Sequence, residues 1–489
     1  MSRAAGDNTS EVEIIAKPPD ETVLVIDLDG SLVRTDLLYE SFFAALTNGF
    51  RHHYSVLAAL CRGKASLKAY LADAGSLDYG LLPHSADVLE FARNAKSDGR
   101  RVYLATASDR NHAEGIARHF GLFDGIFASD GTTNLSDETK ARRLIEAFGI
   151  GGFDYIGNSN ADLAVWSRAR KAYIVGGSPA LVRKVASLGV AVECLHESRP
   201  SFQAWFKALR IHQYVKNALV FVPLLTAHAF TLHFALNATL AFVAFSLCAS
   251  SVYLLNDLVD LDADRRHPTK RKRAFACGAI PLLHGVFAIP LLFILGFACA
   301  AAVSLPFVGM LAGYFTLTLA YSLSLKRKLL VDVVVLAMLY TTRVIAGAVA
   351  LPVLPSEWLL AFSMFVFTCL ALIKRYVELA LRIDKDLPDP SNRNYRLFDL
   401  PIVGALAAAS GLNAVTIFAL YVSSPAVRDI YRYPEALWLI CPILLYWLGR
   451  VVILAHRRAI DDDPIVFAIR DRNSYICGVL MILIVLFAS

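Results

Sequence analysis

The segment SSVYLLNDLVDLDADRRHPTKRKR, residues 250–273, places a row of acidic side chains between an apolar run and a basic run. Asn256, Asp260 and Asp264 recur at a spacing of four residues, and Asp257 lies three residues before Asp260. On a helix this spacing puts oxygen ligands on one face. Such a row suits Mg²⁺ that is held partly through water and bridged to a diphosphate. A solvated helix with ordinary charge pairs is the alternative, but the basic run that follows favours the metal–diphosphate interpretation.

The sequence around this segment is apolar enough to cross a bilayer several times. The chain has 489 residues, of which 56% are hydrophobic and 18% are charged, and its mean hydropathy is +0.50. The apolar excess lies after about residue 210, in runs of the length that a membrane-spanning helix requires. We therefore predict an all-α polytopic bundle of about nine transmembrane helices. The expected spans are 213–231, 234–255, 279–300, 304–323, 330–351, 357–379, 400–422, 436–455 and 475–489.

The connections between these spans alternate in charge, which predicts an orientation in the membrane. Segments 265–273 and 326–328 are rich in Lys and Arg, whereas 351–357 is not. The positive-inside rule assigns the basic connections to the cytoplasm. The N-terminus lacks an apolar signal core, so the N-terminal region should stay cytoplasmic, and an odd number of spans puts the C-terminus outside. We expect a multi-pass protein of the inner (plasma) membrane, and the net charge of +6 does not suggest nucleic acid as a partner.

The N-terminal part of the chain has the pattern of a soluble α/β domain. Short apolar runs at 22–27, 101–108, 153–159 and 171–177 are typical of buried parallel strands, and helical sequence lies between them. We expect a Rossmannoid domain over 21–195, with a small helical cap around 37–82. The remaining boundaries follow as a flexible tail at 1–20, a linker or interfacial helix at 196–212, and the transmembrane domain at 213–489.

Two carboxylates follow the first strand in the sequence VLVIDLDGS, as Asp27 and Asp29. The carboxyl ends of parallel strands are where α/β sheets build their sites. There one carboxylate can attack a phosphate beside a metal, and a second can transfer protons. Thr106, at the end of the next strand, can bond a phosphoryl oxygen, Lys140 can offset negative charge, and Asp162 can bind Mg²⁺. A solvated turn rich in Asp is the alternative.

This order of residues resembles the haloacid-dehalogenase-like phosphatase superfamily over about residues 20–180. The resemblance implies that Asp27 forms an aspartyl-phosphate, that Asp29 is the acid and base, and that Thr106 and Lys140 contact the phosphate. The Mg²⁺ ligands that it implies are Asp27, Asp29, Asn158 and Asp162. Many members carry an aspartate where this chain has Asn158, and the lost charge should lower metal affinity. A degenerate, structural domain is therefore the alternative to an active phosphatase.

The acidic row NDxxDxxxD in a bundle of apolar spans resembles the UbiA prenyltransferase superfamily, over roughly residues 205–489. Within it, the decaprenyl-phosphate phosphoribosyltransferases are the branch that this chain resembles most. The stretches that carry this resemblance are RIHQYVKNALVFVPLL (210–225), HPTKR (267–271), YSLSLK (321–326), RVIAG (343–347), KRYVEL (374–379) and DDDPIVFAIRDR (461–472).

The resemblance implies transfer of 5-phosphoribose from phosphoribosyl diphosphate to a polyprenyl phosphate. Mg²⁺ on Asn256, Asp257, Asp260 and Asp264 would stabilise the leaving diphosphate, and these three aspartates are the expected catalytic residues. The expected phosphate and substrate contacts are Lys216, Asn217, Lys270, Arg271, Tyr321, Lys326, Arg343, Lys374 and Arg375. The α/β domain would then remove the 5-phosphate from the lipid product.

Two other functions remain open. A prenyltransferase would move an isoprenoid from its diphosphate to an aromatic or other small acceptor, usually with the help of a second aspartate-rich loop. The corresponding loop here begins with Lys374, Arg375 and Glu378, which suits an additional phosphate better. A membrane scaffold or transporter with a decayed phosphatase domain is the other alternative. Transporters usually carry ionisable residues near the bilayer midplane, whereas these gather at one side.

Overall fold

The computed structural model divides the chain into two compact units. The α/β unit comprises Met1–Trp205 with Asp257–Gly285, and the helical unit comprises Phe206–Asn256 with Val286–Ser489. The acidic segment 257–285 therefore belongs to the same compact unit as the N-terminal domain. The structure describes residues 22–47, 77–129, 134–195, 202–227, 230–390, 393–425, 427, 431–460 and 463–489. The predicted tail at 1–20 and most of the predicted cap lie outside the described residues.

The described part of the α/β unit contains a parallel sheet in the order β3-β2-β1-β4-β5-β6. The strands are β1 Val23–Asp27, β2 Val102–Asp109, β3 Gly125–Ser129, β4 Phe153–Gly157, β5 Lys171–Val175 and β6 Ala191–Leu195. The predicted strands correspond to β1, β2, β4 and β5, which confirms the expected α/β fold. The short strands β3 and β6 form the two edges of the sheet and were not predicted.

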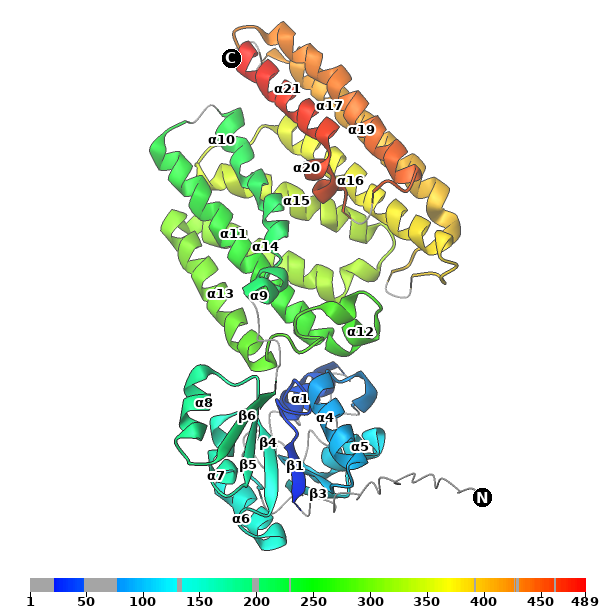
Figure 1. Ribbon diagram of the computed structural model, residues 1–489. Helices are drawn as coiled ribbons and strands as arrows, with labels where there is room; N and C mark the ends of the chain where they lie inside the picture. The colour runs from blue at the N-terminus through cyan, green and yellow to red at the C-terminus, as the bar shows by residue number, and fades with distance from the viewer. Residues whose placement is uncertain are drawn as a thin grey trace, which may run out of the picture. The chain divides into compact units, whose positions relative to one another are not determined.

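Helices cover both faces of this sheet (Figure 1). Successive residues of β1 point to opposite faces, so Leu24 and Ile26 pack on one side and Val23 and Val25 on the other. The first side is covered by α4 (Ala86–Ser97) and α5 (Arg110–Phe120). The second is covered by α6 (Asp137–Phe148), α7 (Leu163–Trp166) and α8 (Pro179–Ala186). Both faces of β1 are thus sealed, and its free carboxyl end carries the polar residues.

The remainder of the α/β unit consists of short elements near the carboxyl end of β1 and in the acidic segment. The helix α1 (Leu37–Thr47) and the 3₁₀ turn η1 (Tyr79–Leu81) flank the undescribed part of the predicted cap. The acidic segment forms α12 (Leu261–Arg266) and the 3₁₀ turn η4 (Lys270–Lys272). The predicted continuous helical row is interrupted, because Asp260 has φ −88° and ψ 14° between α11 (Leu232–Val259) and α12.

Seven helices or helix pairs of the described chain are long and apolar enough to cross a membrane, or eight if the bent pair α20–α21 is counted as one span. This makes the chain an integral multi-pass membrane protein. The helices are α11 Leu232–Val259, α13 Leu282–Val303, α14 Leu305–Leu323, α15 Val331–Ala350, α16 Glu357–Asp384, α17 Leu400–Ser423 and α19 Ile440–His456. The bent pair is α20 Pro464–Arg470 and α21 Arg472–Ala488, with an angle of 81°.

The described residues contain seven or eight candidate spans beside the predicted nine, and the first predicted span is not one long helix. Residues 213–231 instead fall largely in the 3₁₀ segment η3 (Ile211–Phe221) and the short helix α10 (Val222–Thr226). Lys216 and Asn217 are buried there, and Pro223 lies in the first turn of α10, which begins at Val222. Polar groups held inside the bundle and a proline that can occupy only the first helical turn account for the interruption.

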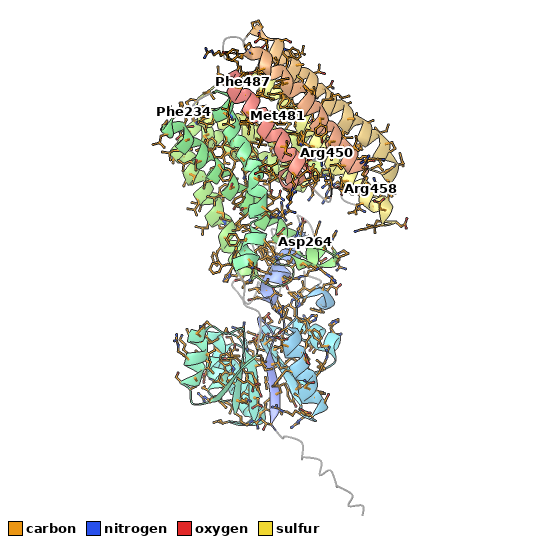
Figure 2. All side chains as sticks on the ribbon, turned by 45° about the horizontal axis from the view of Figure 1, so that its top comes forward. Phe234, Asp264, Arg450, Arg458, Met481 and Phe487 are labelled. Atoms are coloured by element: carbon orange, nitrogen blue, oxygen red, sulfur yellow. The ribbon has the colours of Figure 1, made fainter. Side chains whose placement is uncertain are left out.

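The centre of the helical unit is formed by α15, α16 and α17, whose facing side chains share one apolar core. Both α15 and α16 bury polar residues together with apolar ones, including Asp332, Arg343 and Arg375. Outward-facing side chains are large and apolar: Phe487 on α21 is 69% exposed, and Met481 lies on the same helix (Figure 2). Apolar surface on the outside and ionic groups inside is the arrangement that a bilayer favours.

Candidate active sites

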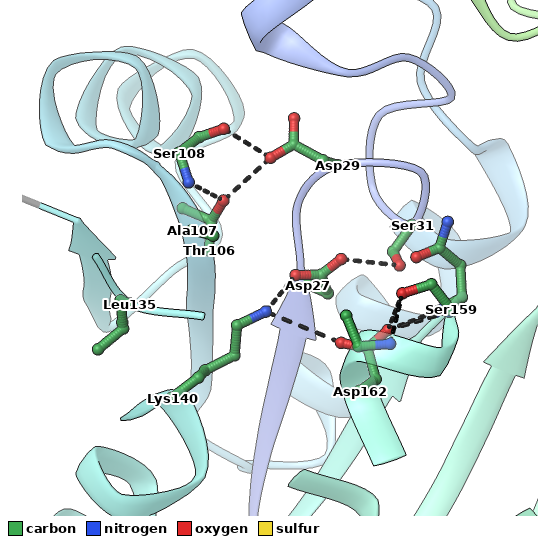
Figure 3. A network of polar contacts seen from close by, with 12 residues as sticks. Asp27, Asp29, Ser31, Thr106, Ala107, Ser108, Leu135, Lys140, Ser159 and Asp162 are labelled. Atoms are coloured by element: carbon green, nitrogen blue, oxygen red, sulfur yellow. Dashed lines mark hydrogen bonds and ion pairs between the residues drawn. The ribbon is translucent and has the colours of Figure 1, made fainter. Parts of the chain in front are cut away.

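The carboxyl end of β1 holds Asp27 in a buried polar network (Figure 3). Lys140 Nζ donates to Asp27 Oδ1 at 2.7 Å, and Ser31 Oγ donates to Asp27 Oδ2 at 3.3 Å. Burial raises the pKa of Asp27 to about 7, and Lys140 offsets only part of this effect. The pKa of Lys140 is itself raised, because the nearby carboxylates outweigh the burial that would lower it. Lys140 thus orients Asp27 and offsets part of the effect of its burial.

Asp29 lies beside Asp27 and is held by three donors. Its Oδ2 accepts hydrogen bonds from Ser108 Oγ at 2.6 Å and from Thr106 Oγ1 at 3.2 Å. Its Oδ1 accepts from the backbone N–H of Leu37, the first residue of α1, at 2.9 Å. Thr106 therefore orients Asp29 in this structure, while the sequence assigned it to the phosphate. Ser108 is an additional contact that the strand pattern did not indicate.

Asp162 completes the network from the loop after β4. Tyr155 Oη donates to Asp162 Oδ1 at 2.9 Å, and the backbone N–H groups of Asn158 and Ser159 donate to Oδ2 at 3.1 Å. Lys140 Nζ lies 3.8 Å from Asp162 Oδ1. The structure therefore brings Asp27, Lys140 and Asp162 together in one network.

Asn158 packs against the turn between the two catalytic candidates. A Cβ atom at Gly30, whose φ is +75°, would lie 2.0 Å from Asn158 Nδ2. Glycine is therefore required at position 30, both for the left-handed backbone and for the close approach of the amide. This contact brings the side chain of Asn158 next to the Asp27–Ser31 turn, where the resemblance expects a metal ligand.

In the acidic segment, Arg273 joins two of the predicted ligands. Its Nη1 lies 3.1 Å from Asp257 Oδ1 and 2.7 Å from Asp264 Oδ2, and both aspartates are buried. Burial raises the pKa of Asp264, Arg273 lowers it, and the neighbouring Asp257 raises it again. Asp260 is half-buried at the break between the helices. Of the basic residues predicted to contact phosphate, Lys270 is half-buried and Arg271 is exposed on η4.

Within the helical unit, Asp463 gathers two of the predicted lysines. Its Oδ2 forms an ion pair with Lys216 Nζ, and Lys374 Nζ lies 3.5 Å from the same oxygen. Asp463 is the N-cap of α20, where its Oδ1 accepts from the backbone N–H of Ile465 at 3.1 Å. The sequence included this residue in a family-like stretch but not among the site residues. An Asp-Pro pair at the start of a helix was the available signal.

Asn217 and Arg343 form a second polar group in the helical unit. Arg343 Nε donates to Asn217 Oδ1 at 2.9 Å, and Arg343 Nη2 donates to Tyr314 Oη at 2.8 Å. Asn217 Nδ2 donates to Ser246 Oγ at 3.0 Å. Both predicted residues are therefore buried and brought together, with their polar atoms directed to other protein groups.

Arg375 is also engaged inside the protein. Its Nε lies 3.0 Å from Asp332 Oδ2, and its Nη1 pairs with Glu378. Arg393 reaches the same two carboxylates, at 3.4 Å each. Three other predicted residues of the helical unit are partly exposed: Asn256, Tyr321 and Lys326. Asn256 Nδ2 donates to Ser322 Oγ at 3.2 Å.

The carboxylates of the α/β site and of the acidic segment carry the negative charge that a Mg²⁺ site needs. Asp162 and Asp29 both raise the pKa of Asp27, so Lys140 does not neutralise the buried carboxylates of the α/β site. In the acidic segment a single cationic group, the Arg273 guanidinium, already bridges two carboxylates. Hard oxygen donors with excess negative charge are the chemistry that Mg²⁺ requires. Among the described residues, however, no three carboxylate, imidazole or thiol groups converge as a metal site.

A parallel sheet with carboxylates at its strand ends and a set of membrane-spanning helices define a multi-pass membrane protein with an α/β domain. The model of the UbiA prenyltransferase family matches residues 218–475, and the chain belongs to this family. The uncharacterized protein y4nM of Sinorhizobium fredii is 38% identical over 462 residues, covering 94% of this chain and 89% of that protein. The relationship to it therefore extends over both the soluble and the membrane parts.

Two further comparisons concern the membrane part. The decaprenyl-phosphate phosphoribosyltransferase of Mycobacterium tuberculosis is 36% identical over 180 residues, covering 36% of this chain and 60% of that enzyme. A solved UbiA homologue of Archaeoglobus fulgidus, bound to GPP and Mg²⁺, is 14% identical with a TM-score of 0.44, covering 58% of this chain and 99% of that chain. For the α/β part, a solved HAD-family hydrolase of Salmonella enterica is 12% identical with a TM-score of 0.28, covering 36% of this chain and 69% of that chain. A solved phosphoserine phosphatase is 16% identical with a TM-score of 0.26, covering 36% of this chain and 93% of that chain. The chain is thus a multi-pass membrane protein of the UbiA prenyltransferase family with an N-terminal α/β domain.

Proposed function

We propose that this protein transfers 5-phosphoribose from phosphoribosyl diphosphate to a polyprenyl phosphate, and that its α/β domain then removes the 5-phosphate. The observation that carries the proposal is the pairing of Lys216 and Lys374 on one carboxylate of Asp463. Two ammonium groups that share an internal anion suit a phosphate-bearing substrate, since lysine binds phosphate as a point charge. The similarity to the mycobacterial phosphoribosyltransferase supports the same donor.

The chemistry follows from what these residues can hold. Mg²⁺, when bound by Asn256, Asp257, Asp260 and Asp264, supplies the charge that stabilises the departing diphosphate. The phosphate of the lipid is already anionic and needs no general base to attack the anomeric carbon. Lys216 and Lys374 can hold phosphate groups, and Lys270, Arg271 and Lys326 are accessible basic groups for the same purpose.

A large apolar cavity in the helical unit supports a lipid substrate. It has a volume of about 690 Å³ and is lined by α10, the start of α16 and the ends of α17 and α21. Phe362 lies at this cavity and Lys374 lies on the same helix, twelve residues further on, a rise of about 18 Å. A phosphate held at Lys374 and an isoprenoid tail directed along α16 would fit an amphipathic donor or acceptor.

The second step is dephosphorylation by the α/β domain. Asp27 would attack the 5-phosphate, and Asp29 would protonate the departing sugar oxygen and then activate water. Lys140 would balance the charge on Asp27 during the attack. We also infer that this domain and the basic connections face the cytoplasm and that the C-terminus lies outside, in the inner membrane.

Mass spectrometry of lipid products tests both steps in the full-length protein. With Mg²⁺, phosphoribosyl diphosphate and polyprenyl phosphate, we expect polyprenyl-phosphate ribose together with diphosphate and inorganic phosphate. Asp27→Asn should accumulate the phosphorylated lipid and release diphosphate alone, whereas Asp264→Asn should make neither lipid. A product in which an isoprenoid is joined to an aromatic acceptor would replace the proposal with the prenyltransferase alternative.

A further inference from the structure

A buried ion pair joins α1 of the α/β domain to α12 of the acidic segment, within one compact unit. Arg265 Nη1 and Nη2 donate to the two carboxylate oxygens of Glu40 at 2.8 and 2.7 Å. The two side chains are only 6% and 2% exposed. A planar guanidinium with two parallel bonds to a carboxylate fixes the orientation as well as the distance. The Glu40–Arg265 ion pair therefore fixes the geometry between the two helices more closely than a surface contact would.

The same arginine also shapes the acidic segment. Arg265 Nε donates to the backbone carbonyl of Ala276 at 3.1 Å, which closes the loop that contains the basic run. Within that loop, Arg273 returns to Asp257 and Asp264. Asp264 is the residue directly before Arg265. The position of the Asp264 carboxylate therefore depends on where Glu40 holds Arg265.

Two further contacts fix the segment against the α/β domain. A Cβ atom at Gly278, whose φ is +71°, would lie 2.7 Å from Arg34 Cβ and 3.2 Å from Pro83 Cβ. The backbone of the segment thus lies directly against the residues that flank α1. Arg266, next to Arg265, also pairs with Asp78 at 3.4 Å on the surface.

The Glu40–Arg265 ion pair lies close to the phosphatase candidates as well. The backbone N–H of Leu37, the first residue of α1, binds Asp29, and Glu40 follows one turn later on the same helix. A buried charge pair contributes little net stability compared with apolar residues of the same shape, but it enforces one geometry. A role in geometry rather than stability fits a helix that contacts both candidate sites.

We propose that Glu40 is a positioning residue for the transferase: through Arg265 it holds the acidic segment in the conformation that binds the metal and diphosphate. The inference rests on the proposed function for the identity of the substrate, but not for the contact itself. It makes the α/β domain necessary for transfer even when its own phosphatase chemistry is removed.

Metal binding provides a test that does not depend on turnover. In full-length Asp27→Asn protein, Mn²⁺ affinity measured by electron paramagnetic resonance should fall about tenfold when Glu40→Gln is added, a change of the size seen when support of metal ligands is lost. Amide hydrogen exchange over 257–276 should quicken in the same variant. Asp262→Asn, which removes the exposed partner of Arg266, is the matched control and should change neither measurement.

Unchanged Mn²⁺ affinity and unchanged amide exchange in Glu40→Gln overturn the proposal, as does an equal loss of affinity in Asp262→Asn. If Glu40→Gln does not fold, Glu40→Asp, which keeps the charge and shortens the side chain, takes its place under the same criteria. If the wild-type protein makes no phosphoribosyl lipid while Glu40→Gln still weakens Mn²⁺ binding, the proposed reaction fails and the positioning role stands.

Discussion

The resemblance to haloacid-dehalogenase-like phosphatases leads us to expect an aspartate at the position of Asn158. Its amide lies against Gly30 in the Asp27–Ser31 turn, so an isosteric carboxylate there would face the same site. We expect Asn158→Asp to lower the Mg²⁺ concentration for half-maximal hydrolysis of p-nitrophenyl phosphate, by about tenfold, because it adds a charged oxygen ligand. Asp162→Asn should change this concentration in the opposite direction. Equal Mg²⁺ requirements in wild type and Asn158→Asp would exclude position 158 from the metal site.

Asp463 forms ion pairs with Lys216 and Lys374, the two lysines that we propose bind phosphate. Replacing it with asparagine keeps an acceptor for Lys216 but removes the competing charge. We expect Asp463→Asn to lower KM for the polyprenyl phosphate and to reduce the free energy of unfolding by about 2 kcal/mol, the value of a hydrogen bond to a charged group. Kinetics in liposomes and thermal unfolding measure the two effects. A higher KM would instead make Asp463 part of the substrate site.

Ion pairs between residues that lie far apart in the chain could not be predicted from the sequence. Lys216 and Asp463 are separated by 247 positions, and Glu40 and Arg265 by 225. No local periodicity connects such residues, and only the folded backbone brings them together. Asp27, Lys140 and Asp162 were predicted because each follows or precedes a recognisable strand in a parallel sheet, whose carboxyl ends must meet at one edge.

At the scale of elements, His112 holds α5 against its neighbours. Its Nε2 shares a hydrogen bond with Ser41 Oγ of α1 at 3.0 Å, and its Nδ1 with Tyr79 Oη of η1 at 3.2 Å. The imidazole is 4% exposed. Burial lowers the pKa of His112 below its ordinary value of 6.5, although Asp109 and Asp29 raise it in part. The folded domain therefore keeps this histidine neutral near neutral pH.

This lowered pKa predicts how stability depends on pH. The unfolded chain binds a proton at His112 before the folded chain does, so the histidine should reduce stability as pH falls below about 6.5. His112→Gln should remove this loss while keeping a polar side chain. Asp27, with its raised pKa, acts in the opposite sense over part of the same range, so the comparison of the two proteins isolates His112. Denaturant unfolding between pH 7.5 and about 5 measures the difference, and parallel curves would contradict the prediction.

The membrane helices could be predicted because an apolar run of sufficient length is rarely found outside a membrane span. The breaks within these helices could not be predicted. The region 213–231 passes as a span by hydropathy, yet Lys216 and Asn217 are buried in a 3₁₀ segment that ends at Phe221. Asp260 likewise lies between α11 and α12, although the four-residue spacing of Asn256, Asp260 and Asp264 fits a continuous helix. Both breaks occur where polar groups find partners inside the protein, which hydropathy does not record.

At the scale of the whole molecule, the chain carries two candidate chemistries on one polypeptide. The transferase product would be a lipid with a 5-phosphate, and the α/β domain would be its phosphatase. Covalent linkage raises the effective concentration of one site for the product of the other, to the millimolar range for short connections. The arrangement is useful only if the intermediate passes to the phosphatase of the same chain.

Mixing two variants that each lack one of the two proposed activities tests whether the lipid intermediate passes to the phosphatase of the same chain. Asp27→Asn retains the transferase and Asp264→Asn retains the phosphatase, so together they contain every proposed catalytic residue. In proteoliposomes that hold both variants at low density, we expect phosphoribosyl lipid to accumulate and phosphate to appear after a lag. Wild-type protein at the same density should release diphosphate and phosphate together, because the linked domain meets the intermediate first. Placing the two variants in separate vesicles should abolish phosphate release altogether, since the lipid cannot leave its membrane. Equal time courses for the mixture and the wild type would show that the intermediate diffuses freely in the bilayer, and covalent fusion would then have no kinetic role.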